Sequence, residues 1–473
     1  MATVVLTAEL VAAATGGRVV AGPASAVFDG VSIDSRTLPA GALFVALRGD
    51  RFDGHDFVAG AIARGAAGVL VERDGADRPG GGPSRAACAV IRVSDTLAAL
   101  QALGRDVRRR SGARVVAITG SAGKTTTKEI AADLLATTYR VFRNRGNLNN
   151  HIGLPLSLVE LCDGPDIAVV ELGMNHAGEI RRLVAIAEPE VRVWTNVGDA
   201  HVGAFGSREA IARAKAEILE GATPRTLLVA NADDPLVMAH AAGFAGRLVT
   251  FGEAASATVR ASNVVDRGVD GTTADVGTPQ GPLALTVPLA GRAHLGNVLA
   301  AVAVALEFGV PTPVIAARTA ALQPVARRGR VTALPGGVRV VDDSYNASPA
   351  AMQSMIAAVA ATRTAGRRIA ILGEMLELGA AGPALHEACG RAAARAGLDE
   401  IVVVGGAGAD GLAAGAVAGG LDAARVHRFA DSASAADAVA RLVRPGDLVL
   451  VKGSRGTRTD VIADRLTHPA EVA

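Results

Sequence analysis

Residues 115–126 read Val115-Val-Ala-Ile-Thr-Gly-Ser-Ala-Gly-Lys-Thr-Thr126, and they join an apolar, β-branched run to a segment whose apolar residues have helical spacing. A strand, a glycine-rich turn, Lys-Thr and a helix form the context that a phosphate-binding loop requires. Gly120 and Gly123 let the backbone approach phosphate oxygens, and the first amides of the helix point at the anion. Lys124 can reach the terminal phosphates of a nucleotide, and the hydroxyl of Thr125 suits Mg²⁺. The stretch therefore predicts a phosphate site where a strand meets a helix.

Lysine is rare in this chain, and its positions are therefore informative. Only four of the 48 basic residues are lysines, namely Lys124, Lys128, Lys215 and Lys452. Arginine is a planar, permanently charged fork, whereas lysine is a compact amine that can be deprotonated and modified. In Ala214-Lys-Ala-Glu217, on a predicted helix, Lys215 could pair with phosphate or react with CO₂ to give a carbamate, an anionic metal ligand. The alternative is an ordinary solvated helix face.

Length and composition limit the class of protein. A chain of 473 residues with 50% apolar residues suggests about three domains with substantial cores. The net charge of +2, with both signs mixed along the chain, argues against a surface dedicated to nucleic acid or acidic lipid. Three widely separated cysteines fit a reducing compartment. The N-terminus lacks a basic region, and the longest apolar run, 298–306, is too short to span a bilayer. We therefore expect a soluble, cytoplasmic protein without membrane insertion.

Short apolar runs alternate with helical segments, which predicts mainly parallel sheets covered by helices. The predicted strands are 31–36, 42–47, 115–118, 167–170, 191–194, 227–229, 247–250, 338–341, 369–372, 401–404 and 448–451. The glycine- and proline-rich stretch 74–83 is predicted to be a loop. The pattern divides the chain into three predicted domains at 1–110, 111–323 and 324–473.

Polar clusters follow three strands of the central block, at Glu171, 196–201 and 231–234. In parallel sheets, ligand groups gather at the carboxyl ends of strands. Glu171 could hold a hard cation there, and the alternative is a helix cap or a solvated acid. His201 lies in a polar, glycine-rich loop, where a histidine satisfied by the backbone is the alternative. Histidine is also an unexpected ligand for Mg²⁺.

The phosphate loop, the Glu171 segment, the His201 loop and the Lys215 segment, in this order, resemble the Mur ligases, which are ATP-dependent amide-bond formers of peptidoglycan precursor synthesis. The resemblance covers nearly the whole chain. Further similar stretches are Asp34-Ser-Arg36, Gly41-x-Leu-Phe-Val-Ala-Leu47, Asp53-Gly-His-Asp-Phe57, Asn147-Leu-Asn-Asn-His-Ile-Gly-Leu-Pro155, Val341-Asp-Asp-Ser-Tyr-Asn-Ala-Ser-Pro349, Leu372-Gly-Glu-Met-x-Glu-Leu-Gly379 and Val451-Lys-Gly-Ser-Arg455.

The resemblance implies a fold and a set of site residues. The fold would have a small N-terminal α/β domain for the UDP substrate, a central P-loop NTPase-like domain with a mainly parallel sheet, and a Rossmann-like C-terminal domain. ATP would bind at Gly120, Ser121, Ala122, Gly123, Lys124, Thr125, Thr126, Asn297, Arg330 and Asp343. Mg²⁺ would be held by Thr125, Glu171, His201 and a carbamylated Lys215. Lys124, Lys215 and His201 would serve catalysis, and Ser35, Arg36, Asn147, Asn149 and Asn150 would contact the UDP substrate.

Residues 120–129 and 342–346 look most like the family member that adds D-alanyl-D-alanine to UDP-N-acetylmuramoyl-tripeptide. The resemblance implies that ATP converts a substrate carboxylate into an acyl phosphate, which the amine of the dipeptide then attacks, in an enzyme that acts as a monomer. Two alternatives remain. One is another ligase of the superfamily, such as a folate polyglutamylating enzyme or the ligase that adds the third residue. The other is a nucleotide switch without ligase activity.

Overall fold

A computed structural model describes residues 3–72 and 88–468, so the loop predicted at 74–83 lies outside the described residues. The chain forms two compact units. Unit 1 comprises Met1–Thr119, Thr138–Arg192 and Glu217–Leu227, and unit 2 comprises Gly120–Thr137, Val193–Ala216 and Leu228–Ala473. Our predicted domain bounds of 1–110, 111–323 and 324–473 stay a prediction.

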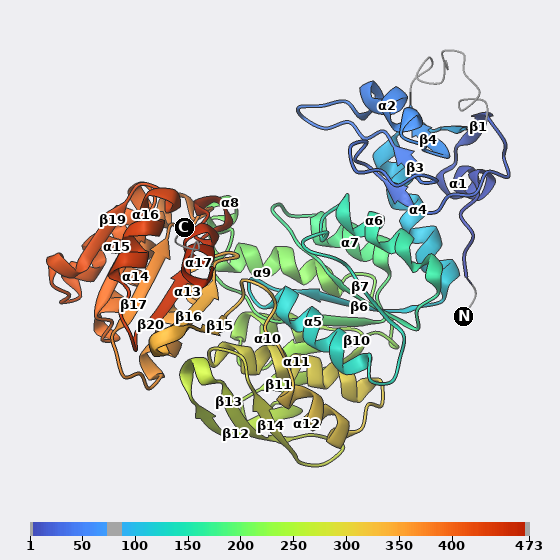
Figure 1. The fold of residues 1–473 in the computed structure, drawn as a ribbon. Coiled ribbons are helices and arrows are strands. Elements are labelled where there is room, and N and C mark those ends of the chain that lie inside the picture. The colour runs from blue at the N-terminus through green and yellow to red at the C-terminus, as the bar shows by residue number, and fades with distance from the viewer. Residues whose placement is uncertain (1–2, 73–87, 469–473) are drawn as a thin grey trace. The chain divides into compact units, whose positions relative to one another are not determined.

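Unit 1 alternates strands with helices along the chain (Figure 1). Its elements are α1 (Ala8–Thr15), β1 (Arg18–Ala21), β2 (Val31–Ser32), β3 (Leu43–Val45), η1 (Gly54–Phe57), α2 (Val58–Ala63), β4 (Gly68–Val71), β5 (Ala89–Arg92), α4 (Thr96–Ser111), β6 (Arg114–Thr119), β7 (Val141–Arg143), α6 (Gly153–Val159), η2 (Glu160–Asp163), β8 (Ile167–Glu171), α7 (Glu179–Ala187) and η3 (Glu217–Leu219). Strands β9 (Val191–Trp194) and β10 (Leu227–Asn231) begin in unit 1 and end in unit 2.

The first sheet of unit 1 has the order β1-β5-β4-β3-β2, and only the β1–β5 pair among its described strands is antiparallel. Strand β2 is shorter than the predicted 31–36, because the carboxylate of Asp34 accepts the backbone N–H of Arg36 at 2.9 Å and turns the chain. Strands β6, β8 and β7 lie side by side in that order and run parallel. The predicted strands at 115–118 and 167–170 are confirmed as β6 and β8.

Unit 2 continues the alternation. Its elements are α5 (Lys124–Leu135), α8 (Val202–Phe205), α9 (Arg208–Ala216), α10 (Pro235–Ala241), β11 (Arg247–Gly252), β12 (Val259–Asp266), η4 (Gly268–Asp270), β13 (Thr272–Gly277), β14 (Leu283–Val287), α11 (Ala293–Glu307), α12 (Thr312–Ala320), β15 (Arg330–Ala333), η5 (Pro335–Gly337), β16 (Arg339–Asp343), α13 (Pro349–Ala361), β17 (Arg368–Gly373), η6 (Gly379–Ala381), α14 (Gly382–Arg395), β18 (Glu400–Val404), α15 (Ala407–Ala418), η7 (Ala423–Arg425), β19 (Val426–Phe429), α16 (Ser432–Leu442), β20 (Leu448–Lys452), η8 (Arg455–Thr457) and α17 (Asp460–Thr467).

Strands β12, β13 and β14 form an antiparallel addition to the row β14-β13-β12-β11-β10. The sequence analysis does not name them. Their residues alternate between buried and exposed positions, as in Leu283–Val287, instead of forming the continuous apolar runs that mark strands buried on both faces. The predicted mainly parallel sheet is therefore extended by an antiparallel meander.

The last sheet of unit 2 has the order β15-β16-β20-β17-β18-β19, and among its described strands only β15 and β16 pair in antiparallel fashion. Along β17, Ala370 and Leu372 pack with residues of α13, α14 and α15, whereas Ile369 and Ile371 pack with residues of α16 and α17. Successive side chains of a strand point to opposite faces, so a strand covered by helices on both faces must be apolar throughout. The Rossmann-like α/β architecture predicted for this part of the chain is confirmed.

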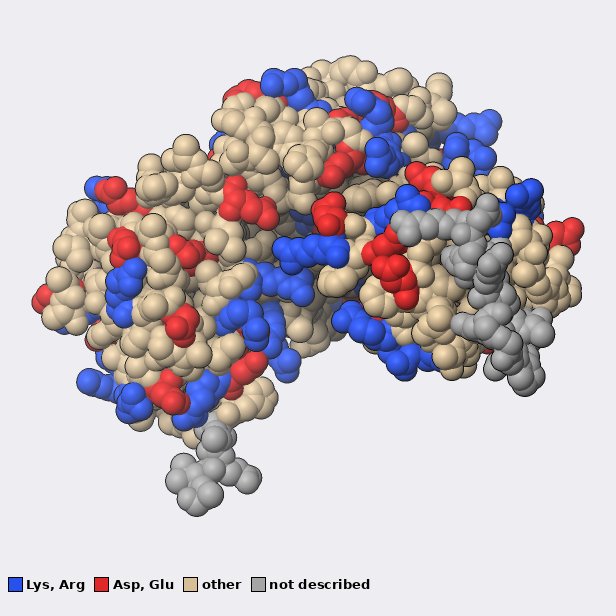
Figure 2. All heavy atoms as spheres, turned by 90° about the horizontal axis from the view of Figure 1, so that it is seen from above, with Lys and Arg blue, Asp and Glu red and all other residues tan. Residues whose placement is uncertain are grey.

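Among the described residues, no helix combines the length and the apolar character needed to cross a membrane. On the face shown in Figure 2, basic and acidic side chains are interspersed among uncharged ones, as the near-neutral net charge leads one to expect.

Candidate functional site

The predicted phosphate loop lies between β6 and α5, and its two glycines are required by close contacts. A Cβ atom at Gly120 would lie 1.9 Å from the hydroxyl of Thr195, and one at Gly123 would lie 2.1 Å from the side-chain oxygen of Asn297. Gly123 also has a φ of 80° at the start of α5, a conformation that glycine adopts without strain. Side chains would therefore prevent the tight turn that aims the first amides of the helix.

The end of β9 holds the phosphate loop in place. The side-chain oxygen of Asn196 accepts the backbone N–H of Ala122 at 2.8 Å, and the hydroxyl of Thr195 donates to the Ala122 carbonyl at 2.7 Å. The backbone N–H of Ser121 donates to the Asn196 carbonyl at 3.0 Å. The polar residues predicted at this strand end thus fix the shape of the loop through hydrogen bonds within the protein.

Two predicted catalytic lysines meet at one backbone oxygen. The ammonium groups of Lys124 and Lys215 donate to the carbonyl of Gly120 at 2.8 Å and 3.0 Å. Lys215 is only 1% exposed, at the end of α9, so the alternative of a solvated helix face is wrong. Two ammonium groups so close together repel each other unless an anion joins them or one loses its charge. The arrangement is suited to a phosphate, and also to a carbamate on Lys215.

His201 lies in the loop after β9 with its Nδ1 2.8 Å from Oε2 of Glu377. Burial lowers the pKa of His201, and the charges of Lys124 and Lys215 lower it further, against an opposing effect of Glu377. The imidazole is therefore biased toward its neutral form, which is the form that can bind a metal. The alternative was a loop histidine whose ring is hydrogen-bonded to the backbone. The Nδ1 partner of His201 is a side-chain carboxylate instead.

The predicted nucleotide contacts lie on three elements of unit 2. The side-chain oxygen of Asn297, on α11, accepts the hydroxyl of Thr127 at 3.3 Å, next to the phosphate loop. Asp343 ends β16 and accepts the ammonium of the buried Lys452 at 2.5 Å. Arg330 begins β15 and is exposed.

Arg328, which the sequence analysis did not select, contacts the phosphate loop directly. Its Nη2 donates to the hydroxyl of Thr125 at 3.2 Å, and its guanidinium carbon lies 4.1 Å from the centroid of the Tyr345 ring. A cation over an aromatic face is attracted by the ring quadrupole and loses side-chain freedom. The structure thus places Arg328, two residues before Arg330, against the predicted Mg²⁺ ligand.

Glu171 is 3% exposed and ends β8 in unit 1. Its Oε1 accepts the side-chain amide of Asn149 at 2.7 Å, and its backbone N–H donates to the side-chain oxygen of the buried Asn144 at 3.1 Å. The alternatives of a solvated acid and of a helix cap do not describe this buried strand residue. The side-chain amide of Asn149 orients the Glu171 carboxylate, and its predicted contact with the substrate stays a prediction. Asn144 is a further residue that positions Glu171, and the sequence analysis missed it.

The other predicted substrate residues also lie in unit 1. Arg36 is exposed and pairs with Asp34 at 2.7 Å, beside the half-buried Ser35. Asn147 and Asn150 are exposed, and the side-chain oxygen of Asn150 accepts the backbone N–H of Gly153 at 2.7 Å, at the start of α6. Their roles in substrate binding stay predictions.

Comparison with known proteins identifies the family. Sequence profiles described as "Mur ligase family, catalytic domain", "Mur ligase middle domain" and "Mur ligase, glutamate ligase domain" match residues 27–108, 118–305 and 327–455. The UDP-N-acetylmuramoyl-tripeptide–D-alanyl-D-alanine ligase of Bacillus subtilis is 34% identical over 453 residues, which are 94% of each chain. The chain belongs to the Mur ligase family.

Solved Mur ligase structures agree with this assignment. MurF from Acinetobacter baumannii is 31% identical, with a TM-score of 0.87 over 99% of this chain and 100% of the other. MurF ligase from Thermotoga maritima, solved in complex with ADP, is 30% identical, with a TM-score of 0.78 over 93% of this chain and 97% of the other. The predicted family and the predicted three-domain α/β fold are confirmed.

The donor set expected of a Mur ligase metal site is unusual. The part of the chain that the structure describes contains no group of three or more His, Cys, Asp or Glu side chains suited to a metal ion. The predicted set instead combines the hydroxyl of Thr125, the carboxylate of Glu171, the imidazole of His201 and the amine of Lys215. Mg²⁺ is commonly held by one or two protein oxygens and completed by phosphate oxygens and water. Taken one by one, the hydroxyl of Thr125 and the carboxylate of Glu171 are oxygen donors of the kind that Mg²⁺ takes, whereas Lys215 would be one only as a carbamate.

Proposed function

We infer that this chain is an ATP-dependent ligase that joins D-alanyl-D-alanine to UDP-N-acetylmuramoyl-tripeptide, giving the pentapeptide, ADP and phosphate in peptidoglycan precursor synthesis. The observation that carries the inference is the relative of this name from Bacillus subtilis, which matches over 94% of each chain. The ADP complex of the Thermotoga maritima relative supports an adenine nucleotide at the phosphate loop.

The residues of unit 2 suit the first chemical step. A carboxylate is a poor electrophile, and transfer of the terminal phosphoryl group gives it a leaving group. Two anions must approach each other in this step, so positive charge is needed where they meet. Lys124, whose ammonium donates to the Gly120 carbonyl, supplies that charge beside the amides of α5. The amine of the dipeptide then attacks the acyl carbon, and phosphate leaves.

We propose that Mg²⁺ is held by Thr125, Glu171 and His201, together with a carbamate on Lys215. When bound, Mg²⁺ would neutralise charge on the phosphate oxygens and on the transferring group. His201 would contribute a neutral imidazole, and the Asn149 amide would keep the Glu171 carboxylate in one orientation.

We also propose that the enzyme acts as a cytoplasmic monomer without a nucleic-acid partner. The three cysteines, Cys88, Cys162 and Cys389, are odd in number and far apart in the sequence, which fits a reducing compartment.

A coupled assay of ADP release tests the proposed function. We expect release to require UDP-N-acetylmuramoyl-tripeptide and to rise further with D-alanyl-D-alanine, because the acyl phosphate persists until an amine removes it. Release with glutamate and folate, or with a diamino acid and the UDP-dipeptide, would identify another ligase of the superfamily. Hydrolysis that ignores all of these acceptors would identify a nucleotide switch.

Arg328 and Arg330 provide a paired test of which arginine serves the nucleotide. We expect Arg328→Ala to raise the KM for ATP roughly tenfold or more, because a charge-assisted hydrogen bond at the phosphate loop is lost. Arg330→Ala should have the smaller effect, since Arg330 is exposed at the start of β15. Steady-state kinetics at saturating dipeptide measure both values, and a larger effect at Arg330 would contradict the assignment.

A further inference from the structure

The loop that carries His201 is docked on the segment 374–379 by several independent contacts. Beyond the His201–Glu377 pair, the backbone N–H of Gly203 donates to the Glu377 carbonyl at 3.1 Å. A Cβ atom at Gly203 would lie 2.7 Å from the Glu377 carbonyl oxygen and from the Gly379 nitrogen. Val202, next to His201, packs against the core cluster that contains Met375 and Leu378. The two backbones are therefore built to touch, and the side-chain pair is not an isolated surface contact.

Both partners of the pair hold an uncommon backbone conformation. His201 and Glu377 have φ angles of 68° and 67°. Residues other than glycine adopt such angles at an energetic cost, and they keep them where the surroundings hold them and where function needs the geometry. The surroundings of Glu377 are rigid, because Met375 donates its N–H to the ring of His386 at 2.8 Å and Leu376 donates its own to the Ser454 hydroxyl at 2.9 Å.

The chemistry of imidazole makes this contact specific. A neutral imidazole has one N–H and one lone pair, and a carboxylate can only accept a hydrogen bond. With Nδ1 2.8 Å from Oε2 of Glu377, the proton belongs on Nδ1 and the lone pair on Nε2. Histidines that bind metals commonly donate their second nitrogen to a carboxylate, which fixes the tautomer and the ring orientation.

We propose that Glu377 is a positioning residue of this ligase, which holds His201 with Nε2 available to a divalent cation and thereby couples the docking of segment 374–379 to cation binding at the phosphate loop. The proposal rests on the proposed function, in which His201 is a metal ligand. Because coupling between two equilibria is reciprocal, cation and nucleotide binding must also stabilise the docked segment.

The variant that tests this is Glu377→Asn. Asparagine tolerates the positive φ of this position, but its side chain is one methylene shorter and cannot reach His201. We expect Mn²⁺, titrated by electron paramagnetic resonance in the presence of a non-hydrolysable ATP analogue, to bind roughly 10- to 100-fold more weakly than to the wild type. Glu377→Gln retains an acceptor oxygen at the same reach and should recover most of the affinity. Glu387→Asn, which removes an ion pair with Arg391 within α14, is the matched control and should bind Mn²⁺ as the wild type does.

A second readout follows the imidazole itself. Long-range ¹H–¹⁵N spectra, assigned with a His201→Asn variant, should show the Nδ1–H tautomer in the wild type and its loss in Glu377→Asn. Hydrogen exchange of peptide 374–379 should slow when Mg²⁺ and the ATP analogue are added to the wild type, and not in Glu377→Asn.

Unchanged Mn²⁺ affinity and tautomer in Glu377→Asn would overturn the proposal, even if the wild type shows dipeptide-dependent ADP release. Failure of that release in the wild type, with the Mn²⁺ shift intact, would overturn the proposed function alone.

Discussion

Lys215→Ala is expected to lower ligase turnover roughly 100- to 1,000-fold, the range found when a preorganised charge beside the reacting groups is removed. Lys215 is 1% exposed, and its ammonium lies 3.0 Å from the Gly120 carbonyl at the turn of the phosphate loop. As an ammonium, Lys215 supplies positive charge at the loop, whereas as a carbamate it supplies an anionic metal ligand, and the substitution removes either one. The coupled ADP assay measures the change.

Rescue by small acids separates these two roles. Formate or acetate can occupy the space left by Lys215→Ala and replace a carbamate, so partial recovery of turnover is expected. Lys215→Arg keeps the positive charge but cannot form a carbamate, and it should stay nearly inactive. Lys128→Ala removes another buried lysine of unit 2 and serves as the control, because small acids should not restore it. Near-full activity of Lys215→Arg would show that charge alone is required and that the carbamate is absent.

The amino-acid sequence alone shows that lysine is rare, and three of the four lysines prove to be buried. Lys128, Lys215 and Lys452 are each at most 2% exposed. The expectation that lysine persists where arginine cannot serve fits this burial, since a compact amine fits confined sites that a planar fork does not. The phosphate loop and the polar ends of β8 and β9 were predictable for a similar reason, because strand, turn and helix signals are local in the sequence.

The contacts made by segments distant in sequence could not be predicted in this way. Arg328 carries no local signal, and Glu377 lies in a stretch similar to the Mur ligases that gives its side chain no role. Both become candidates only because the fold brings them to Thr125 and His201. Asn144 likewise acts through its contact with Glu171, 27 residues along the chain. The meander β12–β14 was missed because half-buried strands alternate in polarity and lack a continuous apolar run.

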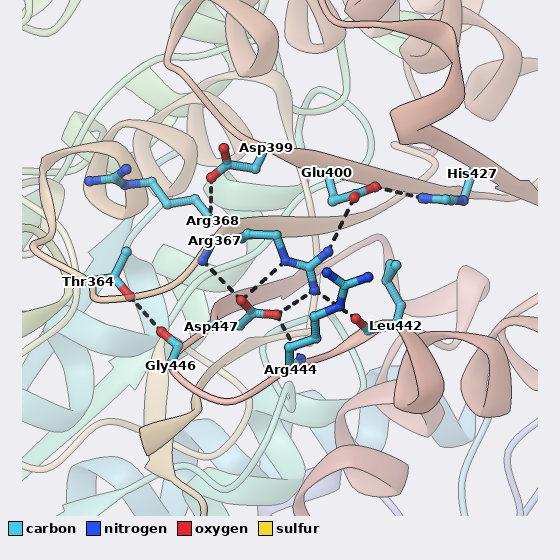
Figure 3. A network of polar contacts seen from close by, with 10 residues as sticks. All are labelled: Thr364, Arg367, Arg368, Asp399, Glu400, His427, Leu442, Arg444, Gly446 and Asp447. Atoms are coloured by element: carbon cyan, nitrogen blue, oxygen red, sulfur yellow. Dashed lines mark hydrogen bonds and ion pairs between the residues drawn. The ribbon is translucent and has the colours of Figure 1, made fainter. Parts of the chain in front are cut away.

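A partly buried ion-pair network joins the strands of the last sheet (Figure 3). Asp447, 1% exposed, precedes β20 and accepts Nη2 of Arg367 at 2.7 Å and the backbone N–H groups of Arg444 and Arg367 at 2.8 Å and 2.9 Å. Arg367 also pairs with Glu400 at 3.2 Å, and His427 lies 2.7 Å from the same carboxyl group. One carboxylate thus joins the starts of β17 and β20, and the arginine extends the network to β18.

Asp447→Asn is expected to destabilise this sheet by about 3 kcal/mol, because the substitution removes the buried carboxylate that pairs with Arg367 and leaves the guanidinium with Glu400 as its remaining acidic partner in the network. The new side-chain amide would also turn an N–H donor toward the backbone N–H groups of Arg444 and Arg367, whose hydrogen bonds the Asp447 carboxylate accepts in the wild type. Urea unfolding followed by circular dichroism, with hydrogen exchange of peptides from β17 and β20, measures the loss. Asp437→Asn is the matched control, since Asp437 is 66% exposed and its pair with Arg465 should contribute no more than about 1 kcal/mol.

The deficit of Asp447→Asn should also depend on pH in one direction. Burial raises the pKa of Asp447, but the Arg367 side chain and the backbone N–H groups of Arg444 and Arg367 outweigh it and hold the pKa below its usual 3.8. A carboxyl group whose pKa is lower in the folded state contributes its full stability above the unfolded pKa and loses it as the pH falls through the folded pKa. The difference in unfolding free energy between wild type and variant should therefore be constant from pH 7 to about pH 5 and shrink below about pH 4. A difference that stays constant into that acidic range would mean that the Asp447 charge does not stabilise the sheet.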